Sequence, residues 1–158
     1  MIREAFISDH IELTEIAFLA KQGWDYPAGY IEIWKDELTV TQDYIRENAV
    51  FVFEQESQVI GFISLVENKQ EKTVDNVLIE TGFWMDHLFI HPDFQKMGIG
   101  KLLTEYLINF CRKSKISSLY IFVDPNAVGF YEKFGAKFVR MSKSSIPDRE
   151  LPVFVLNI

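Results

Sequence analysis

The sequence predicts a mixed α/β fold, with a central mixed sheet of about six to seven strands flanked by helices. Three observations predict this class. β-rich runs recur from the first residues to the last, amphipathic helical segments interrupt them, and a strand–helix–strand unit in the middle is long enough for a parallel crossover. The 158 residues contain no linker and no repeat, so we expect one domain spanning residues 1–158.

Bulk properties narrow the classes of function. The formal charge of −7 disfavours nucleic-acid binding, which needs clustered Lys and Arg. No apolar run approaches the ~18 residues of a membrane span, and the first residues show no secretory signal. Cys111 is the only cysteine and lies on the apolar face of a predicted helix, so we expect it to be buried. These properties favour a cytoplasmic protein with no membrane and no nucleic-acid partner.

The first half of the chain is predicted from its periodicity and its capping residues. Apolar residues from Ile11 onward at roughly helical spacing, with Asp9 as N-cap and Gly23 as the stop, predict a helix. Two β-rich runs around the polar segment EQESQ predict a hairpin over residues 49–67. The remaining expectations are a strand at 1–6, a loop at 24–29, two helical pieces within 30–48, a flexible loop at 68–76 and one long strand at 77–90.

The second half is predicted in the same way. A helix over 99–114 is expected from one apolar face, which is formed by Ile99, Leu102, Leu103, Tyr106, Leu107, Phe110 and Cys111. A short helix over 124–135 follows from Asp124 as cap, Pro125 in the first turn and Gly135 as the stop. Further strands are expected at 117–123, 136–141 and 151–158.

Two glycines, Gly98 and Gly100, open the long helix directly after a strand, which is the arrangement of an anion site. Unpaired amides at a helix N-terminus attract phosphate oxygens, and glycine lets a ligand approach the backbone closely. Lys101 in the first turn is unfavourable for the helix dipole unless an anion binds there. The stretch is neither a P-loop nor a dinucleotide fingerprint, because Gln95 replaces a required Gly and Leu103 a required small residue.

The segment QKMGIG, residues 95–100, resembles the Q/R-x-x-G-x-G/A motif of the GNAT superfamily of acyl-CoA N-acyltransferases. The surrounding LFIHPDFQKMGIGKLL resembles the strand–turn–helix of that superfamily, and DPNAVGFYEKFGAKFV resembles its late helix. The resemblance is specific over residues 86–139 and extends to the rest of the chain as the order of elements. It implies a GNAT-like fold whose sheet splays between the fourth and fifth strands.

The same resemblance implies acetyl-CoA as co-substrate, lying in the gap between the splayed strands. Its pyrophosphate would bind the amides of the glycine turn, and its pantetheine arm would pair with the preceding strand. The residues expected to contact it are Leu88, Phe89, Ile90, Gln95, Lys96, Met97, Gly98, Ile99, Gly100, Lys101, Asn126, Tyr131 and Lys133. Asn126 is included because Asp124 stands where the superfamily commonly has Asn, and its alternative role is local capping. Lys133 could equally be a solvated side chain.

Acyl transfer to an amine needs a base that removes a proton and an acid that protonates the departing thiolate. The resemblance assigns the acid to Tyr131, whose phenol is protonated at neutral pH. The alternative for Tyr131 is a packed ring with a solvated hydroxyl. For the base we expect Asp86 first and Glu80 second, since strict alternation would put both on one face of their strand unless a bulge intervenes.

The three histidines do not form a metal-ligand set. His10 is distant in the sequence from His87 and His91, so we expect no metal site. Either His87 or His91 could serve as the base, although each is more often structural.

The resemblance implies that the acceptor binds near the loop between the first helices. Trp24, Asp25 and Tyr26 lie in this loop and combine aromatic faces with a carboxylate, which suits a cation. Trp34, on the following helix, is expected in the core. The acidic balance favours a small cationic amine as acceptor, and peptide amines stay open.

Two classes of function are consistent with the sequence. The first is an acetyl-CoA-dependent N-acetyltransferase that works by direct attack in a ternary complex, because Cys111 is expected to be buried. The second is a non-catalytic acyl-CoA-binding sensor or partner module on the same fold. O-acylation or a longer acyl donor stays open, and the strand-rich C-terminal segment offers an edge for a homodimer.

Overall fold

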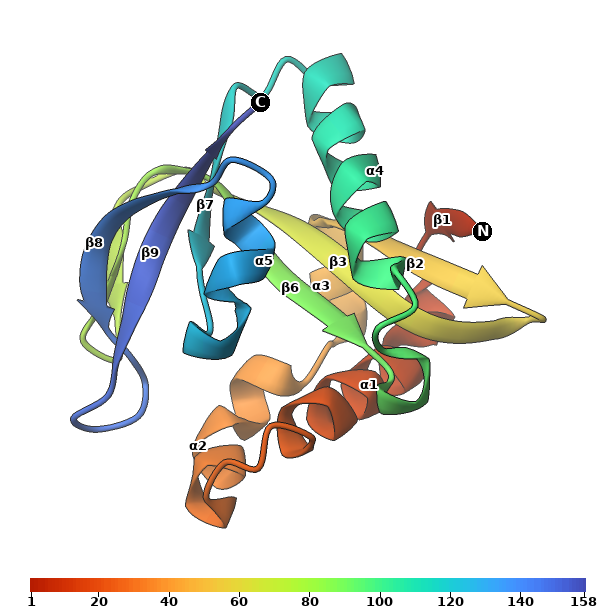
Figure 1. The fold of residues 1–158 in the computed structure, drawn as a ribbon, viewed down its shortest axis with the longest axis horizontal. Helices are drawn as coiled ribbons and strands as arrows, with labels where there is room; N and C mark the ends of the chain where they lie inside the picture. Colours follow the sequence, from red (N-terminus) through yellow and green to blue (C-terminus); the bar gives the residue numbers. More distant parts are fainter. The chain divides into compact units, whose positions relative to one another are not determined.

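The computed structural model describes residues 1–158, which form both helices and strands (Figure 1). The helices are α1 (His10–Gln22), α2 (Ala28–Leu38), α3 (Gln42–Glu47), α4 (Ile99–Lys113) and α5 (Val128–Glu132). Three short 3₁₀ helices are η1 (Ile7–Asp9), η2 (Pro92–Phe94) and η3 (Pro125–Ala127). The strands are β1 (Ile2–Glu4), β2 (Ala49–Gln55), β3 (Gln58–Asn68), β4 (Lys72–Val74), β5 (Val77–Ile79), β6 (Gly82–Ile90), β7 (Ser118–Phe122), β8 (Lys137–Lys143) and β9 (Glu150–Asn157).

Seven strands form a mixed sheet in the order β1-β2-β3-β6-β7-β9-β8, and β4 pairs with β5 in a separate ladder. β6 and β7 are parallel, so the chain must cross over between them, and α4 lies in that connection. Their ladder is a single Cα pair, Trp84 with Tyr120, whereas β7 pairs with β9 along its whole length. The predicted α/β class is confirmed, and the short ladder joins the fourth and fifth strands of the sheet, where the resemblance implies a splay.

The chain divides into two compact units. The first comprises residues 1–65 and 87–107, and the second comprises residues 66–86 and 108–158. Because β3, β6 and α4 each contribute residues to both, the division does not follow element boundaries.

In the first unit, the hairpin and the helical pieces are found where the sequence predicts them. β2 and β3 are joined by a tight turn at Glu56 and Ser57, which both have positive φ (51° and 64°). The helical segment predicted over 30–48 is two helices, α2 and α3, and the side chain of Thr41 caps α3 by accepting the N–H of Tyr44 at 3.0 Å.

The start of α1 differs from the prediction. Asp9 makes no side-chain cap bond, because its carboxylate accepts the Phe6 N–H at 2.7 Å and pairs with Arg3 at 2.9 Å. Ile11, predicted on the apolar face, is exposed, and the buried face begins at Leu13. The Asp9 carboxylate, predicted to cap the helix, is therefore bound to Arg3 of β1 instead.

α4 buries a narrower face than predicted. Leu103, Leu107 and Cys111 are fully buried, whereas Leu102 and Tyr106 are exposed. Burial raises the pKa of the Cys111 thiol to about 11. Cys111 is therefore a neutral core residue, as predicted.

In the second unit, a short hairpin replaces the flexible loop predicted at 68–76. β4 pairs antiparallel with β5, and Asp75 and Asn76 at the turn have positive φ of 49° and 66°. Glu80 and Thr81 separate β5 from β6, so the single long strand predicted here is wrong.

The rest of the second unit is the antiparallel ladder β7-β9-β8 with α5, and its core includes Leu119 and Val153. The cap predicted at Asp124 is confirmed, since its Oδ1 accepts the N–H of Asn126 at 2.9 Å and so starts η3, just before α5. Gly135, with φ +87°, follows α5 as the predicted stop. None of the helices combines the length and the apolar character that a membrane crossing requires.

Candidate active site

The glycine turn lies in the first unit, between β6 and α4. The side chain of Gln95 donates from Nε2 to the carbonyl of Ile90 at 3.2 Å, which ties the turn back to the end of the strand. Lys96 and Gly98 both have positive φ, 63° and 82°. A Cβ built on Gly98 would meet no atom within 4 Å. Glycine at 98 is therefore required by its backbone conformation, and the space beside it is open.

The N-terminus of α4 follows directly. The N–H of Leu102 donates a hydrogen bond to the carbonyl of Gly98 at 3.1 Å. The N–H groups of residues 99–101 lie before Leu102, in the first turn of the helix. Such groups have no intrahelical acceptor and carry the positive end of the helix dipole, so they can bind an anion. Lys101 reaches Glu105 at 3.8 Å, one turn along an exposed helix face, where an ion pair is weak.

The glycine turn is positively charged, whereas the net charge of the chain is negative. Residues 95–101 include Lys96 and Lys101 and no carboxylate, in a chain whose net charge is −7. Residues 95–98 are exposed to solvent. Exposed residues, the N-terminal N–H groups of α4 and two lysine ammonium groups thus occur together at this turn.

The strand segment predicted to pair with the pantetheine arm, residues 88–90, lies at the end of β6 and is partly buried. The ring of Phe89 lies 5.8 Å from that of Phe62 in β3. A Cβ on Gly61 would lie 2.7 Å from Cδ1 of Ile90 and 3.2 Å from the carbonyl oxygen of Phe89. Gly61 therefore permits the close approach of β3 to β6, a role indicated in the sequence by a glycine inside a strand.

A buried hydroxyl network contacts β6 at His87, just before residues 88–90. Ser64 is completely buried, its Oγ accepts the backbone N–H of His87 at 3.0 Å, and it lies 2.8 Å from the phenol oxygen of Tyr44. The N–H of His87 is thus bound by a side chain within a strand. Because the peptide is planar and trans, the carbonyl of Asp86 points away from Ser64. The Asp86 side chain itself is exposed.

Glu80 is held in a structural ion pair. Its two carboxylate oxygens accept hydrogen bonds from Nε and Nη2 of Arg140 at 2.7 and 2.9 Å. Its backbone carbonyl accepts from the side chains of Trp84 and Asn68, each at 2.9 Å. The hydrogen bonds from Arg140 lower the pKa of Glu80, which makes this carboxylate a weaker base.

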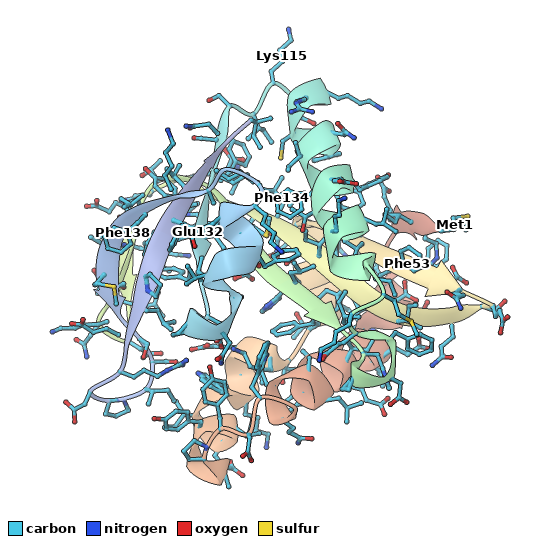
Figure 2. The ribbon with its side chains drawn as sticks, in the orientation of Figure 1. Met1, Phe53, Lys115, Glu132, Phe134 and Phe138 are labelled. Carbon is cyan, nitrogen blue, oxygen red and sulfur yellow. The ribbon has the colours of Figure 1, made fainter.

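Tyr131 is buried on α5, the helix on which Figure 2 labels Glu132. Burial, with a smaller effect from the charge of Asp124, raises the pKa of the Tyr131 phenol. The phenol therefore stays protonated at neutral pH. Asn126 and Lys133, the other cofactor candidates of this unit, are exposed.

The acceptor candidates lie between α1 and α2. Trp24 is exposed, and Asp25 has a positive φ of 59°. Tyr26 packs edge-on against Trp34, with ring centroids 5.2 Å apart, and Trp34 is buried as predicted. The Nζ of Lys21 lies 4.6 Å from the Trp34 ring centroid, so these rings already face a cation within the chain.

Sequence comparison identifies the family. The model of the acetyltransferase (GNAT) family matches residues 10–136. The chain belongs to the GNAT acetyltransferase family. The peptidyl-lysine N-acetyltransferase YjaB of Salmonella typhimurium is 32% identical over 133 residues, which covers 81% of this chain and 87% of YjaB. The uncharacterized N-acetyltransferase ycf52 of Porphyra purpurea is 28% identical over 138 residues, 85% of this chain and 71% of ycf52. The chain is an N-acetyltransferase.

Solved GNAT structures share the fold. A GCN5-related N-acetyltransferase from Rhodopseudomonas palustris matches with a TM-score of 0.78 at 16% identity, over 100% of this chain and 95% of the other. The PaiA N-acetyltransferase from Thermoplasma acidophilum, solved in complex with coenzyme A, matches with a TM-score of 0.71 at 22% identity, over 100% of this chain and 98% of PaiA.

The GNAT site residues predicted from the sequence fall into two groups. The first unit brings together the end of β6 and the glycine turn, and it also holds the loop with Trp24, Asp25 and Tyr26. The second unit holds Glu80, Asp86, Asn126, Tyr131 and Lys133. No group of three His, Cys, Asp or Glu side chains is placed to hold a metal ion.

Proposed function

We propose that this GNAT protein transfers the acetyl group of acetyl-CoA to a primary amine of a small cationic molecule or a peptide, within one domain formed by residues 1–158. The observation that carries the proposal is the glycine turn. The N-terminal N–H groups of α4, the two lysines and the positive φ of Gly98 suit a pyrophosphate that lies against the backbone. The coenzyme A bound by PaiA supports this assignment.

The residues that would hold the donor follow from this fit. We assign the pyrophosphate to the backbone of Gln95–Lys101 and the pantetheine arm to the backbone of residues 88–90. Asn126 and Lys133, both exposed, are assigned as further contacts. The donor supplies an activated thioester, and the chain supplies binding, orientation and proton transfer.

The proton transfers are assigned to Asp86 and Tyr131. An alkylamine has an ordinary pKa of about 10.4 and must lose a proton before it can attack a thioester. The exposed carboxylate of Asp86 would accept this proton, directly or through water, whereas Glu80 is the second choice because Arg140 holds it. The buried phenol of Tyr131 would donate a proton to the departing thiolate.

Direct attack in a ternary complex is favoured over an acetylated enzyme. Cys111 is the only cysteine, it is fully buried, and burial raises its pKa to about 11. A thiol in that environment is a poor nucleophile.

For the acceptor, the names of the relatives suggest a class. YjaB, and YiaC of Escherichia coli at 28% identity over 108 residues, are peptidyl-lysine N-acetyltransferases. We propose a lysine side chain, free or in a peptide, as the first acceptor to test.

The assigned roles are tested by Tyr131→Phe and Asp86→Asn in steady-state kinetics. Each removes one proton-transfer group with little change in volume, so we expect kcat to fall about 100-fold while the Kd for acetyl-CoA stays within about twofold. Tyr106→Phe and Asp148→Asn, which make the same chemical changes at exposed positions, are the controls and should retain wild-type kcat. Unchanged turnover in both site variants would contradict the assigned roles.

A further inference from the structure

One hydrogen bond between β3 and β6 is accepted by a side chain. The N–H of His91, just after β6, donates to the carbonyl of Ile60 at 2.8 Å, and four residues earlier the N–H of His87 donates to Oγ of Ser64 at 3.0 Å. The two strands are therefore antiparallel, with the same step of four residues on each. A regular antiparallel ladder pairs such N–H groups with backbone carbonyls. At His87 a serine hydroxyl accepts the bond.

Tyr44 holds this hydroxyl from the other side. Its phenol oxygen lies 2.8 Å from Oγ of Ser64, which is completely buried, and its ring lies 5.6 Å from the ring of His87. Tyr44 is itself fixed at the start of α3, where its N–H donates to Oγ1 of Thr41 at 3.0 Å. The Ser64 hydroxyl is therefore held between a helix and a strand.

The hydrogen bond at His87 also fixes the peptide that follows Asp86. This peptide is planar and trans, so the direction of the His87 N–H sets how the backbone is rotated after the Cα of Asp86. The Asp86 carboxylate, the proposed base, is exposed. Proton transfer requires the accepting oxygen to lie within hydrogen-bond reach of the amine, and small displacements lower the rate strongly. A buried anchor directly after Asp86 limits the positions that its carboxylate can take.

We propose that Ser64 and Tyr44 are positioning residues for the reaction. The Ser64 hydroxyl, held by Tyr44, keeps the Asp86–His87 peptide in the orientation in which Asp86 accepts the proton of the acceptor amine. This role rests on the proposed function and adds to it two residues that act through Asp86 and transfer no proton themselves.

The first measurement needs neither acetyl-CoA nor an acceptor. It is amide hydrogen exchange of the free full chain, followed by NMR, in the wild type, Ser64→Ala and Ser142→Ala. Ser142 is also buried, and its hydroxyl donates to the carbonyl of Lys143 at 2.8 Å, so Ser142→Ala is a matched loss of a buried serine hydroxyl. We expect the His87 N–H to exchange about tenfold faster or more in Ser64→Ala, and at the wild-type rate in Ser142→Ala. Equal exchange of this N–H in all three proteins would overturn the proposal.

The second measurement is steady-state kinetics with acetyl-CoA and a lysine-containing peptide, at a temperature at which circular dichroism shows every variant to be folded. Ser64→Ala should lower kcat about tenfold or more and leave the Kd for acetyl-CoA within about twofold, because only the base is displaced. Tyr44→Phe removes the phenol hydroxyl and keeps the ring, so it tests the same role with a milder change, and we expect kcat to fall about threefold. Ser142→Ala and Tyr106→Phe, which lies at an exposed position, should retain the wild-type kcat. Wild-type kcat in Ser64→Ala would overturn the proposal, and wild-type kcat in Tyr44→Phe would overturn the part of Tyr44.

A double variant separates positioning from stability. If Ser64 acts through Asp86, its loss has no further effect once Asp86 is replaced, so Ser64→Ala/Asp86→Asn should turn over within about twofold of Asp86→Asn alone. A hydroxyl that only stabilises the fold would slow both backgrounds equally. A further loss of about tenfold in the double variant would therefore overturn the positioning role and leave the proposed function intact.

The proposed function fails in a different way. No turnover by the wild type, or wild-type kcat in Asp86→Asn, would refute it and the positioning role with it, while the Ser64–His87 hydrogen bond would stand on the exchange measurement.

Discussion

Glu80 and Asp86 are similar carboxylates six positions apart in the sequence, and their surroundings differ. Glu80 receives two hydrogen bonds from Arg140 at 2.7 and 2.9 Å, whereas the Asp86 side chain is exposed. The sequence indicates both as candidate bases because it places them on one predicted strand. Arg140, 60 positions away from Glu80, is the partner that local patterns could not identify.

The ion pair of Glu80 predicts a pH-dependent stability. Because Arg140 lowers the folded-state pKa of Glu80 below its ordinary value of 4.5, the stabilisation is fully present above that value and is lost as the pH falls through the folded-state pKa. Glu80→Gln should therefore lower the free energy of unfolding by about 1 kcal/mol near neutral pH. The difference from wild type should shrink in acid.

Urea denaturation across this pH range measures the effect, with Glu132→Gln, an exposed residue of α5, as the control. A constant difference between wild type and Glu80→Gln at every pH would show that the carboxylate charge does not stabilise the fold.

At the scale of elements, β6 has a backbone N–H that is bound by a side chain. The N–H of His87 donates to Oγ of the buried Ser64, which also lies 2.8 Å from the phenol of Tyr44. Two polar groups therefore depend on one hydroxyl, and losing it would leave both without that partner.

Ser64→Ala should destabilise the protein by about 1–3 kcal/mol, because it leaves a strand N–H without its acceptor. Guanidinium denaturation measures this change. Ser114→Ala, at an exposed position after α4, should lie within about 0.5 kcal/mol of wild type. A Ser64→Ala protein as stable as wild type would mean that a water or a backbone group replaces the hydroxyl.

The elements were predicted correctly where local sequence patterns determine them, and incorrectly where residues distant in the sequence determine the structure. The hairpin of β2 and β3, the helix α4 and the cap at Asp124 follow from periodicity and capping residues. The β4–β5 hairpin was missed because β4 is short and lies in a polar segment, although Asp75 and Asn76 are typical turn residues. The exposure of Leu102 depends on neighbours that α4 alone does not reveal.

At the scale of the whole molecule, the order of elements and two motifs were sufficient to predict the fold class and the family. The seven-stranded mixed sheet and the family match over residues 10–136 confirm both. The identity of the acceptor could not be predicted, because contacts such as that of Lys21 with the Trp34 ring form only when α1 and α2 pack. The glycine turn is a local motif, whereas the surroundings of the α1–α2 loop depend on tertiary contacts.

The central claim is that the glycine turn binds acetyl-CoA, and calorimetric titration tests it most directly. Wild-type protein, Gly98→Ala and Gly29→Ala are titrated with acetyl-CoA and with free CoA. Gly98 has φ +82°, where a residue with a side chain is strained, whereas Gly29 lies in α2 without a positive φ; a Cβ built on either glycine meets no atom within 4 Å.

We predict micromolar binding of both ligands by the wild type and by Gly29→Ala, and binding about tenfold weaker or more by Gly98→Ala. Absence of binding by the wild type, or equal affinity in all three proteins, would contradict the account, and the glycines would then serve only to turn the chain.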